Sequence, residues 1–380
     1  DIFTAIYKSF ELLFLMDKSI IQARSRLANV YLDSVITLNW SVTLISLLLI
    51  LKPLIYQPIV SAMDRAKVRN LVNRFGSNPI TYLAVEEDKR YFFSRAVEGV
   101  IAYTIANGVA VCDSEPICDV KDAAILTSEF IASCRENDLS ICFCQASDTY
   151  WPELKSLGFG RVKYGDEAMF KLSGYNLAGK RAAKVRYGVN HADRIGIRVE
   201  EYRPNEKRDR RKENEIRSVS REWLRMKKSG EMTFMLGTIG LENPMDKRYF
   251  LGYDSEGKLQ GFIVFTPFLA GKGYHADVTR RRKDAPVGVM EKITVCAFNT
   301  MRDEGVEWGS LGLAPLSNMV GDRERANPAE KFLDFIYEHM IRFYGFKTLY
   351  HYKKNYGPTD WVTRYLIYYP DSFNLKIAYA

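Results

Sequence analysis

The sequence predicts an α/β protein with mixed α+β sheets, arranged as two successive modules that a basic helix joins and a membrane-associated helical segment precedes. Its 380 residues favour two domains over one, and 47% hydrophobic with 26% charged residues is typical of a globular chain. Short runs of β-branched and aromatic residues alternate with helical patterns from about residue 64 onward. Before them, residues 34–51 carry no charge, which is the length expected of a membrane-spanning helix.

The first 63 residues are predicted to form the membrane-associated segment. The uncharged stretch resumes at Pro53, which is expected to bend or end the helix. The basic cluster from Arg65 to Arg74 follows, and the positive-inside rule therefore predicts that the rest of the chain faces the cytoplasm. Residues 2–16 are apolar but too short to span, which suits an interfacial helix. A buried or interfacial helix at 34–60 is the alternative reading. Because the chain opens without Met, we expect it to be the tail of a longer membrane protein.

The first module is expected to cover residues 64–176. Its pattern is a helix, four strands, a helix, a strand, a short helix and two closing strands, separated by turn signals. In chain order we expect a helix at 64–75, strands at 80–86, 91–94, 99–106 and 108–113, a helix at 120–137, a strand at 139–145, a helix near 149–157, and strands at 159–164 and 168–172.

A basic connector helix at 177–196 leads into the second module, residues 197–380. The order of elements is similar to that of the first module, although the identity between them is too low to indicate a repeat. We expect strands at 197–202, 248–254, 259–267, 274–279, 307–313, 346–353 and 364–369, with helices at 205–228, from Pro286 to about 304, and from Asn327-Pro328.

The positive charge of the chain is concentrated around this connector. The net charge is +8, and residues 180–228 alone hold 17 Lys and Arg against 8 Asp and Glu. A local excess indicates an anionic partner rather than a uniformly basic surface. Six scattered cysteines without a C-x-x-C pair argue against a disulfide scaffold and against a zinc site, so we expect reduced thiols and no metal.

The densest group of chemically useful residues is YHADVTRRRKDAPVGVMEKI (274–293). A strand ends near Asp277, Arg280 follows three residues later, and a turn with Pro286 and Gly288 opens a helix. A strand-loop-helix junction of this kind presents backbone N–H groups and a positive dipole end to an anion. The alternative is a solvated basic turn without a ligand.

A second group, LYHYKKNYGPTDWVTRYL (349–366), mixes aromatic residues with cations, a combination that suits base stacking and phosphate contact. Aromatic packing on an edge strand is the alternative. The turn SLGLAPLSN (310–318) is a weaker candidate that permits close backbone approach. The candidate substrate-binding residues from these two segments are Tyr352, Lys353, Lys354, Trp361, Arg364 and Ser317.

Other catalytic classes find little support in the sequence. G-x-S-x-G, H-E-x-x-H and Walker loops are absent, and the four histidines are not at ligand spacings. His275 alone is adjacent to a candidate site, whereas Cys142 and Cys144 share one face of a predicted strand and are expected to be core residues.

Together, segments 277–293, 310–318 and 350–366, behind a membrane tail, make the chain resemble the phosphatidylglycerol lysyltransferase family, also called aminoacyl-phosphatidylglycerol synthases or multiple peptide resistance factors. The resemblance runs from about 64 to 369 and implies tandem GNAT-like acyltransferase modules, the second of them catalytic. The family pattern of Asp, two residues, then Arg is matched by Asp277 and Arg280. Its Gly-x-Met-Asp appears here with Glu291 as the carboxylate, one methylene longer.

The resemblance implies transfer of an amino acid from aminoacyl-tRNA to a glycerol hydroxyl of phosphatidylglycerol at the bacterial cytoplasmic membrane, lowering its negative charge. Lysine is the first choice, with alanine or arginine open, and no cofactor is implied. Asp277 and Glu291 would hold the aminoacyl ammonium or accept a proton. Arg280, Lys353 and Arg364 would bind lipid phosphate or the tRNA end. The basic connector would bind tRNA through Lys180, Arg181, Lys184 and Arg186.

Two alternatives from other classes stay open at this point. One is a membrane-tethered tRNA-binding protein without catalysis, and the other is an acetyl-CoA-dependent acyltransferase on the same fold. The segment RKDAPVGVM (282–290) has a single glycine where a CoA pyrophosphate loop usually has two, which argues against CoA. The oligomeric state and the presence of an upstream flippase domain are left open.

Overall fold

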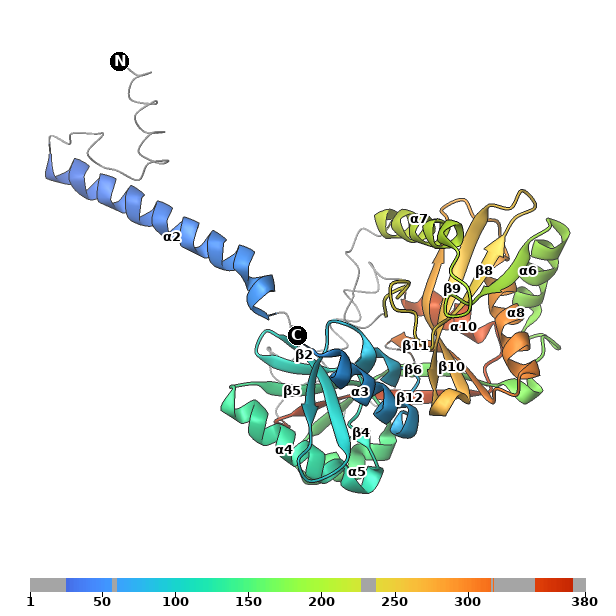
Figure 1. Ribbon diagram of the computed structural model, residues 1–380, viewed down its shortest axis with the longest axis horizontal. Coiled ribbons are helices and arrows are strands. Elements are labelled where there is room, and N and C mark those ends of the chain that lie inside the picture. Colours follow the sequence, from blue (N-terminus) through green and yellow to red (C-terminus); the bar gives the residue numbers. More distant parts are fainter. Residues whose placement is uncertain (1–24, 57–59, 227–236, 316, 318–345, 372–380) are drawn as a thin grey trace, which may run out of the picture. The chain divides into compact units, whose positions relative to one another are not determined.

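The computed structural model describes residues 25–56, 60–226, 237–315, 317 and 346–371. The chain divides into two compact units, Asp1–Ile59 and Val60–Ala380, which are considered separately (Figure 1). The predicted interfacial helix at 2–16 and the helix expected from Asn327-Pro328 lie outside the described residues.

The first unit contains one long apolar helix, α2 (Arg26–Tyr56). Its stretch Arg26–Leu47 is long and apolar enough to cross a membrane, with a mean hydropathy of 1.3 and exposed side chains such as Leu44 and Ile45. An apolar surface of this kind is typical of a helix that contacts lipid. Pro53 was expected to bend or end the helix; α2 continues past it for three residues and ends at Tyr56, so Pro53 is not the last residue, and the expected bend stays a prediction.

The second unit is built on one mixed sheet, which holds twelve strands in the described residues. Their order is β1-β2-β3-β5-β12-β6-β11-β10-β9-β8-β7, with β4 beside β2. This confirms the predicted α/β class. The strands are β1 (Arg90–Phe93), β2 (Gly99–Ala106), β3 (Val109–Cys112), β4 (Ile117–Cys118), β5 (Ser140–Ala146), β6 (Gly160–Lys171), β7 (Arg198–Tyr202), β8 (Arg248–Tyr253), β9 (Leu259–Phe268), β10 (Gly273–Arg281), β11 (Trp308–Pro315) and β12 (Asp360–Tyr369).

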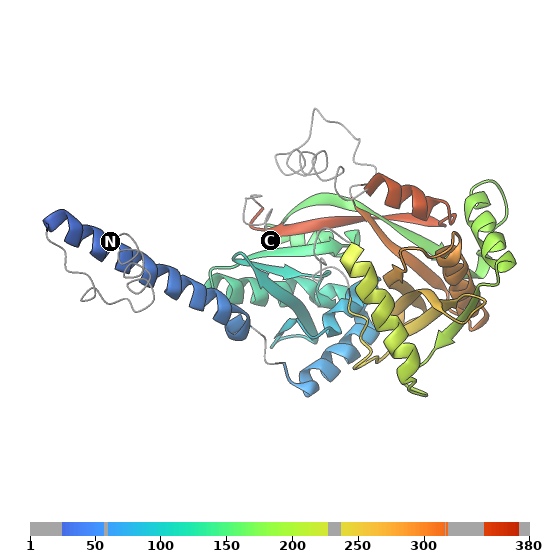
Figure 2. The same cartoon turned by 90° about the horizontal axis from the view of Figure 1, so that it is seen from above.

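Helices cover both faces of this sheet. They are α3 (Ala62–Phe75), α4 (Ala123–Glu136), α5 (Trp151–Ser156), α6 (Ala183–Arg194), α7 (Arg210–Met226), α8 (Val289–Asp303) and α10 (Phe346–Lys354). Successive residues of a strand point to opposite faces, and β8 follows this rule. Phe250 packs in the same core as Met290 of α8, whereas Leu251 packs with Ile216 of α7. The helices α7 and α8 therefore lie on opposite faces of the sheet (Figure 2).

The last strand, β12, lies between β5 and β6 and pairs antiparallel with both. Ile367 of β12 consequently packs in one core with Phe143 of β5, while Phe170 of β6 packs with Phe298 of α8. The C-terminal strand thus contributes to the core next to β5, far from its own neighbours in sequence. The division into modules at 64–176 and 197–380 stays a proposal.

Three predicted elements are wrong. Residues 80–86 are not a strand but contain a 3₁₀ helix, Thr81–Val85, because the Asn78 side chain and carbonyl accept the Ile80 and Thr81 N–H groups and start a turn. Residues 346–353 form α10, where Leu349 is half-buried and Lys353, one helical turn later, is buried. The strands expected at 159–164 and 168–172 are a single strand, β6.

The basic connector is shorter than predicted. Residues 179–182 form a turn and helix α6 begins only at Ala183, while the second basic helix, predicted at 205–228, begins at Arg210. Both helices are amphipathic, so their cations stay on the outer surface while small and apolar residues face the sheet or a neighbouring helix.

Candidate active site

Strands β10 and β11 run side by side for only part of their length. In the part of the chain that the structure describes they pair in parallel at three positions, the last being His275 opposite Ser310. An irregularity in β10 before Val278 and a register shift in β11 before Leu313 follow at once. The last pair therefore marks the point at which the two strands stop pairing, and the candidate residues lie just beyond it.

Asp277 and Arg280 follow this point on β10, and both are buried. Asp277 Oδ1 accepts a hydrogen bond from the Gly237 backbone N–H at 2.9 Å. Arg280 donates to the Ser220 hydroxyl, and its guanidinium lies 5.3 Å from the centre of the Trp223 ring. The structure thus brings the two predicted catalytic residues to the sheet face that α7 covers.

The Asp277 carboxyl is held in a setting that disfavours its charge. Burial raises its pKa to about 6, although Lys247, the Gly237 N–H and Arg280 all act in the opposite direction. Its second oxygen, Oδ2, is buried and has no hydrogen-bond partner among the described residues. A buried acceptor without a partner suits a donor supplied by a ligand, such as an ammonium or a hydroxyl.

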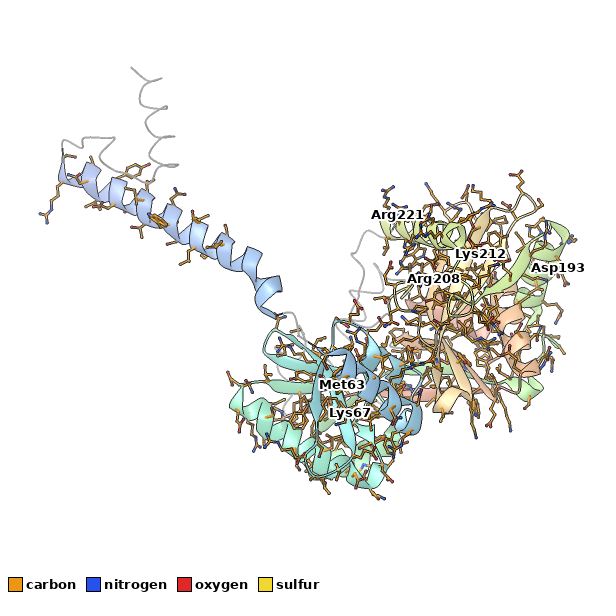
Figure 3. All side chains as sticks on the ribbon, in the orientation of Figure 1. Met63, Lys67, Asp193, Arg208, Lys212 and Arg221 are labelled. Carbon is orange, nitrogen blue, oxygen red and sulfur yellow. The ribbon has the colours of Figure 1, made fainter. Side chains whose placement is uncertain are left out.

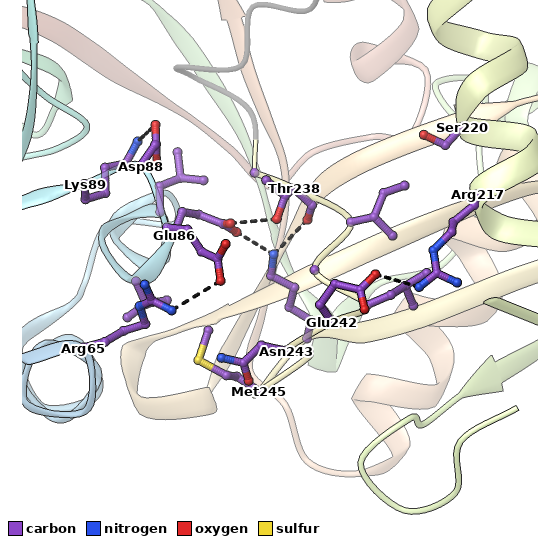
Figure 4. A pocket seen from close by; sticks show the side chains of 18 of the residues that line it. Arg65, Glu86, Asp88, Lys89, Arg217, Ser220, Thr238, Glu242, Asn243 and Met245 are labelled. Atoms are coloured by element: carbon purple, nitrogen blue, oxygen red, sulfur yellow. Dashed lines mark hydrogen bonds and ion pairs between the residues drawn. The ribbon is translucent and has the colours of Figure 1, made fainter. Parts of the chain in front are cut away.

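A cavity of about 560 Å³ opens in front of Gly237 and Arg280. Most of its wall comes from the segment around Glu86, the inner edge of α7 and residues 237–247, and Arg65 and Arg280 complete it. Lys247 joins two of these parts, with its Nζ 2.5 Å from Glu86 Oε1 and 2.8 Å from the Thr238 carbonyl oxygen. Figure 4 shows Glu86 and Thr238 facing each other in this wall. The remaining ion pairs in this wall are Arg65–Glu87, Lys89–Asp88 and Arg217–Glu242.

In these ion pairs, the negative charges of the cavity wall are neutralised by neighbouring cations. Each of the four carboxylates that line it lies beside a cation, and the guanidinium of Arg280, which donates to Ser220 and lies against the Trp223 ring, is also part of the lining. The apolar side chains of Leu83, Leu224 and Ile239 complete the lining. A cavity with apolar walls and a buried guanidinium suits an anionic group attached to an apolar body.

A second buried cluster centres on Glu167 of β6. Glu167 Oε2 accepts from Arg364 Nε at 2.7 Å, and Oε1 accepts from the Ser310 hydroxyl at 2.6 Å. His275 Nδ1 lies 3.1 Å from the same hydroxyl. Burial would raise the pKa of Glu167, but the Arg364 charge, with His275 and the hydrogen bonds, lowers it below its usual range. The Arg364 guanidinium therefore binds the Glu167 carboxylate. The predicted contact of Arg364 with substrate stays a prediction.

Lys353 reaches the same region from α10. Its Nζ donates to the Leu313 carbonyl at 2.6 Å, and burial lowers its pKa to about 7 despite the opposing charge of Glu167. A side chain at position 312 would come within 3.6 Å of this Nζ and 2.9 Å of the His275 ring, so Gly312, at φ +79°, keeps the space open. A buried amine that is partly neutral near pH 7 can accept a proton.

The other predicted substrate-binding residues lie at different places. Ser317 donates to Asp166 Oδ2 at 3.0 Å and accepts from the Asp166 N–H, which fixes it to β6. Lys354 is exposed, with its Nζ 5.8 Å from the centre of the Tyr350 ring. Trp361 packs on that same ring at 4.6 Å. None of these contacts tests a role in substrate binding, which stays a prediction.

Glu291 does not join Asp277 and Arg280. It lies in the first turn of α8, on the opposite face of the sheet, where Gly188 of α6 packs against it. Tyr352 and Tyr356 are near it, with hydroxyls 2.6 Å apart, and the Glu291 charge helps burial to raise the pKa values of both. The predicted catalytic trio is therefore split, and Glu291 shares its surroundings with Tyr352.

The predicted tRNA-binding residues also differ among themselves. Lys180 and Arg181 are exposed in the turn before α6, and Lys184 is exposed in its first turn. Arg186 instead donates to the carbonyls of Leu177 and Gly179, and so holds the turn that precedes the helix. Three of the four residues are thus available to an anionic partner.

Sequence reasoning missed Glu86, Lys247, Glu167 and Ser310, which build the two buried clusters. The signal that could have revealed Glu167 is the pair of adjacent carboxylates in YGDEAMF (164–170), within an otherwise buried strand. Charged residues are rarely buried without a partner, so an acidic pair there predicts a buried cation.

Helix α6 covers the N-terminus of α8. A Cβ at Gly288, the residue before α8, would lie 2.0 Å from the Gly188 carbonyl oxygen, so the two backbones are in direct contact. A CoA pyrophosphate loop would lie in the turn before this helix, since helix N-termini bind phosphates. Helix α6 packs directly against this turn, where the pyrophosphate of acetyl-CoA would have to bind. This contact is a steric argument against an acetyl-CoA donor.

Comparison with known proteins finds one family model and several similar proteins. Residues 69–368 match the family model described as phosphatidylglycerol lysyltransferase, C-terminal. The phosphatidylglycerol lysyltransferase of Staphylococcus haemolyticus is 26% identical over 309 residues, which cover 81% of this chain and 36% of that protein. The enzyme of that name from Bacillus subtilis is 26% identical over 316 residues, 82% of this chain and 36% of that protein. The chain thus spans little more than a third of the length of these relatives.

Two solved structures share the fold. L-PGS from Bacillus licheniformis superposes with a TM-score of 0.71 at 23% identity, covering 82% of this chain and 93% of that one. A C-terminal domain from Agrobacterium fabrum gives a TM-score of 0.71 at 24% identity, covering 83% and 94%. The likeness extends over nearly the whole of both structures and confirms the predicted fold class.

Proposed function

Because the chain belongs to the phosphatidylglycerol lysyltransferase C-terminal family, we propose that it transfers an amino acid from aminoacyl-tRNA to a glycerol hydroxyl of phosphatidylglycerol. Lysine is the amino acid we propose. The curated relatives carry this activity in their names, and the chain spans little more than a third of their length. The transfer would take place at the cytoplasmic face of the membrane to which α2 anchors the chain.

The single observation that carries the proposal is the Asp277–Arg280 pair beside the cavity. A buried carboxyl with one oxygen that has no hydrogen-bond partner among the described residues and a buried guanidinium, a few residues apart on one strand, offer one site for a positive group and one for a negative group. The proposed substrates supply both, since an aminoacyl ester carries an ammonium, while the lipid carries a phosphate and the transition state carries an oxyanion.

The reaction exchanges one ester for another. The lipid hydroxyl oxygen bonds to the aminoacyl carbonyl carbon, the bond from that carbon to the tRNA ribose oxygen breaks, and the proton of the lipid hydroxyl ends on the ribose oxygen. Positioning and charge stabilisation are the main demands of such a step. Arg280 would stabilise the negative charge. Asp277 would hold the ammonium or accept the proton, and Lys353 is the second candidate for proton acceptance.

The test uses the full chain reconstituted with phosphatidylglycerol vesicles, charged tRNA and a labelled amino acid. Label should appear in the lipid, more from lysine than from alanine or arginine, and should disappear after RNase treatment. Arg280→Ala should reduce transfer by about 100-fold or more, whereas the exposed Lys121→Ala should leave it unchanged. Transfer that survives RNase, or that needs acetyl-CoA, would contradict the proposal.

A further inference from the structure

The loop formed by residues 237–247 contacts Asp277 at its first residue and a distant part of the chain at its last two. Gly237 donates its backbone N–H to Asp277 Oδ1 at 2.9 Å. Asp246 and Lys247 contact residues that lie 177 and 161 positions earlier in the sequence, on α3 and just after the 3₁₀ helix Thr81–Val85. The residues that hold the end of this loop can therefore affect the position of Gly237.

Asp246 provides the first of these contacts. Its carboxylate accepts from Arg69 Nε, at 2.7 Å, and from Arg69 Nη2, while its backbone N–H donates to the Tyr82 hydroxyl at 3.2 Å. Arg69 follows Lys67 by two residues, so it lies on the opposite side of α3 from the exposed Met63 and Lys67 (Figure 3). The loop is thus bound to the inner side of α3.

Glu86 provides the second contact and reaches both ends of the loop. Its Oε1 accepts from Lys247 Nζ at 2.5 Å, and its Oε2 accepts from the Thr238 hydroxyl at 2.7 Å (Figure 4). Lys247 Nζ also donates to the Thr238 carbonyl oxygen at 2.8 Å, so the three residues form a closed ring of hydrogen bonds. Glu86 and Lys247 are buried. Because Thr238 directly follows Gly237, this ring fixes the chain next to the N–H group that holds Asp277.

The first residues of the loop have little room to move. A Cβ at Gly240 would lie 2.7 Å from Lys247 Nζ, and a Cβ at Gly237 would lie 1.8 Å from Asp277 Oδ2. Gly240 also has φ +65°, a conformation that costs glycine little. Residues 237–240 are therefore packed between the Lys247 ammonium and the Asp277 carboxyl, and a shift at one contact is transmitted to the other.

We propose that Glu86 is a positioning residue for the transfer reaction, because it binds Lys247 and Thr238 and thereby keeps the Gly237 N–H on the Asp277 carboxyl. The inference rests on the proposed function and extends it. It assigns a role in the reaction on β10 to a residue that precedes β1 in the chain.

Glu86 also changes the charge around Asp277. Lys247 and Arg280 favour the carboxylate form of Asp277, whereas Glu86 disfavours it. Arg217, which α7 brings to the same cavity, is neutralised by its own ion pair. Substituting Glu86 therefore alters charge and position together, and a second variant must alter position alone.

Thr238→Val is that second variant, since it removes the hydroxyl that donates to Glu86 and changes no charge. In the vesicle assay with charged tRNA, Thr238→Val and Glu86→Gln should each reduce kcat/KM roughly ten-fold, the effect of losing one hydrogen bond to a charged group. Thr238→Ser keeps the hydroxyl and should recover most of the rate. The double variant should be no slower than the slower single variant, because both changes break the same contact. Glu136→Gln, an exposed position at the end of α4, is the matched control.

A second measurement requires no transfer. The difference in unfolding free energy between a protein and its Asp277→Asn variant depends on pH through the pKa of Asp277. The Gly237 N–H lowers this pKa, so losing that bond should raise it. In the full chain in detergent, the pH dependence of this difference should therefore move up by roughly 0.7 pH unit in the Thr238→Val background and return to the wild-type position in Thr238→Ser.

Three results would overturn the inference: an unchanged rate per folded molecule in Thr238→Val, additive losses in the double variant, or the same pH dependence of the Asp277→Asn difference in Thr238→Val as in the wild type. The two measurements also separate this inference from the proposed function. A wild type that transfers no amino acid, together with a shifted pH dependence in Thr238→Val, rejects only the proposed function. Transfer that depends on tRNA, with an unshifted pH dependence, rejects only the positioning role of Glu86.

Discussion

Arg364 and Glu167 form a buried two-point ion pair, with Arg364 Nε and Nη2 at 2.7 and 2.6 Å from the same carboxylate oxygen. The pair connects β12 to β6, two strands that are neighbours in the sheet but lie 197 residues apart in the chain. The other oxygen of the Glu167 carboxylate accepts a hydrogen bond from the Ser310 hydroxyl, which lies at the point where β10 and β11 stop pairing. One interaction therefore ties the C-terminal strand to the candidate active site.

Removing one member of this pair should destabilise the second unit strongly. Arg364→Ala leaves Glu167 buried without its cation, and breaking a buried pair in this way typically costs about 3–5 kcal/mol of unfolding free energy. Denaturant unfolding of the full chain in detergent measures the loss. The exposed Arg95→Ala serves as the control and should stay within about 0.5 kcal/mol of the wild type. A loss in Arg364→Ala as small as that of the control would mean that the pair does not stabilise the sheet.

Helix α2 should be responsible for membrane attachment. Its stretch Arg26–Leu47 meets the length and hydropathy of a span, and the second unit begins at Val60 as a separate compact body. A chain that starts at Val60 should therefore fractionate mostly without the membrane, while the full chain stays with it after alkaline extraction. Protease added outside spheroplasts should not cleave near Arg65–Arg74, since the positive-inside rule puts these residues in the cytoplasm. Cleavage there from outside would reverse the topology.

The sequence could predict Asp277 and Arg280 but not their shared surroundings. Residues three apart on a regular strand point to opposite faces, and these two meet α7 together because β10 is irregular between Ala276 and Val278. A bulge of this kind depends on the neighbouring strand and leaves no periodic signal in the sequence. Local patterns predict which residues are candidates for chemistry, whereas long-range pairing decides which of them meet.

The dependence on long-range pairing also explains why α10 was predicted as a strand and why Glu167 was not among the predicted site residues. The segment 346–353 is rich in aromatic residues and so resembles a strand, but the partial burial of Leu349 and the burial of Lys353 follow the helical repeat. The partner of Glu167 lies on a strand that enters the sheet from the far end of the chain. The order of strands is set by the packing of the whole sheet, and no short segment of the sequence predicts it.

The pKa of Asp277 predicts how its contribution to stability changes with pH. The folded protein raises this pKa from 3.8 to about 6, so folding favours the protonated form. The contribution is present in full below about pH 4 and is lost as the pH rises through about 6, which amounts to roughly 3 kcal/mol for two pKa units. Asp277→Asn cannot titrate, so relative to wild type it should gain that amount between about pH 4 and pH 7.

Comparing the unfolding free energies of wild type and Asp277→Asn separates the effect of Asp277 from that of His275. The stability contribution of His275 changes over the same pH range but in the opposite direction. Burial lowers the pKa of His275 to about 4, so its contribution to stability falls as the pH drops from about 6.5. Both proteins keep His275, and its effect therefore cancels in the difference between their unfolding free energies. A difference that does not change with pH would mean that the Asp277 carboxyl is not perturbed in the folded state.

Gly237 should be essential for the position of Asp277. A Cβ added at Gly237 would lie 1.8 Å from Asp277 Oδ2 and 2.7 Å from the carboxyl carbon, so one of the two groups must move. Gly237→Ala should displace the carboxylate by about 1 Å and reduce transfer on the order of 100-fold, because a misplacement of that size disrupts the reacting geometry. The labelled-lipid assay measures the loss.

The matched control is Gly174→Ala, since a Cβ at Gly174 meets no atom within 4 Å and should leave transfer unchanged. The raised pKa of Asp277 gives a second readout that a general loss of folding would not produce. If Asp277 accepts the proton, the acidic limb of the rate profile near pH 6 should shift in Gly237→Ala, because the displaced carboxyl loses both its burial and the Gly237 N–H. Full activity with an unshifted profile in a folded Gly237→Ala protein would separate Asp277 from the chemistry and direct the search to Lys353 and the Glu167 cluster.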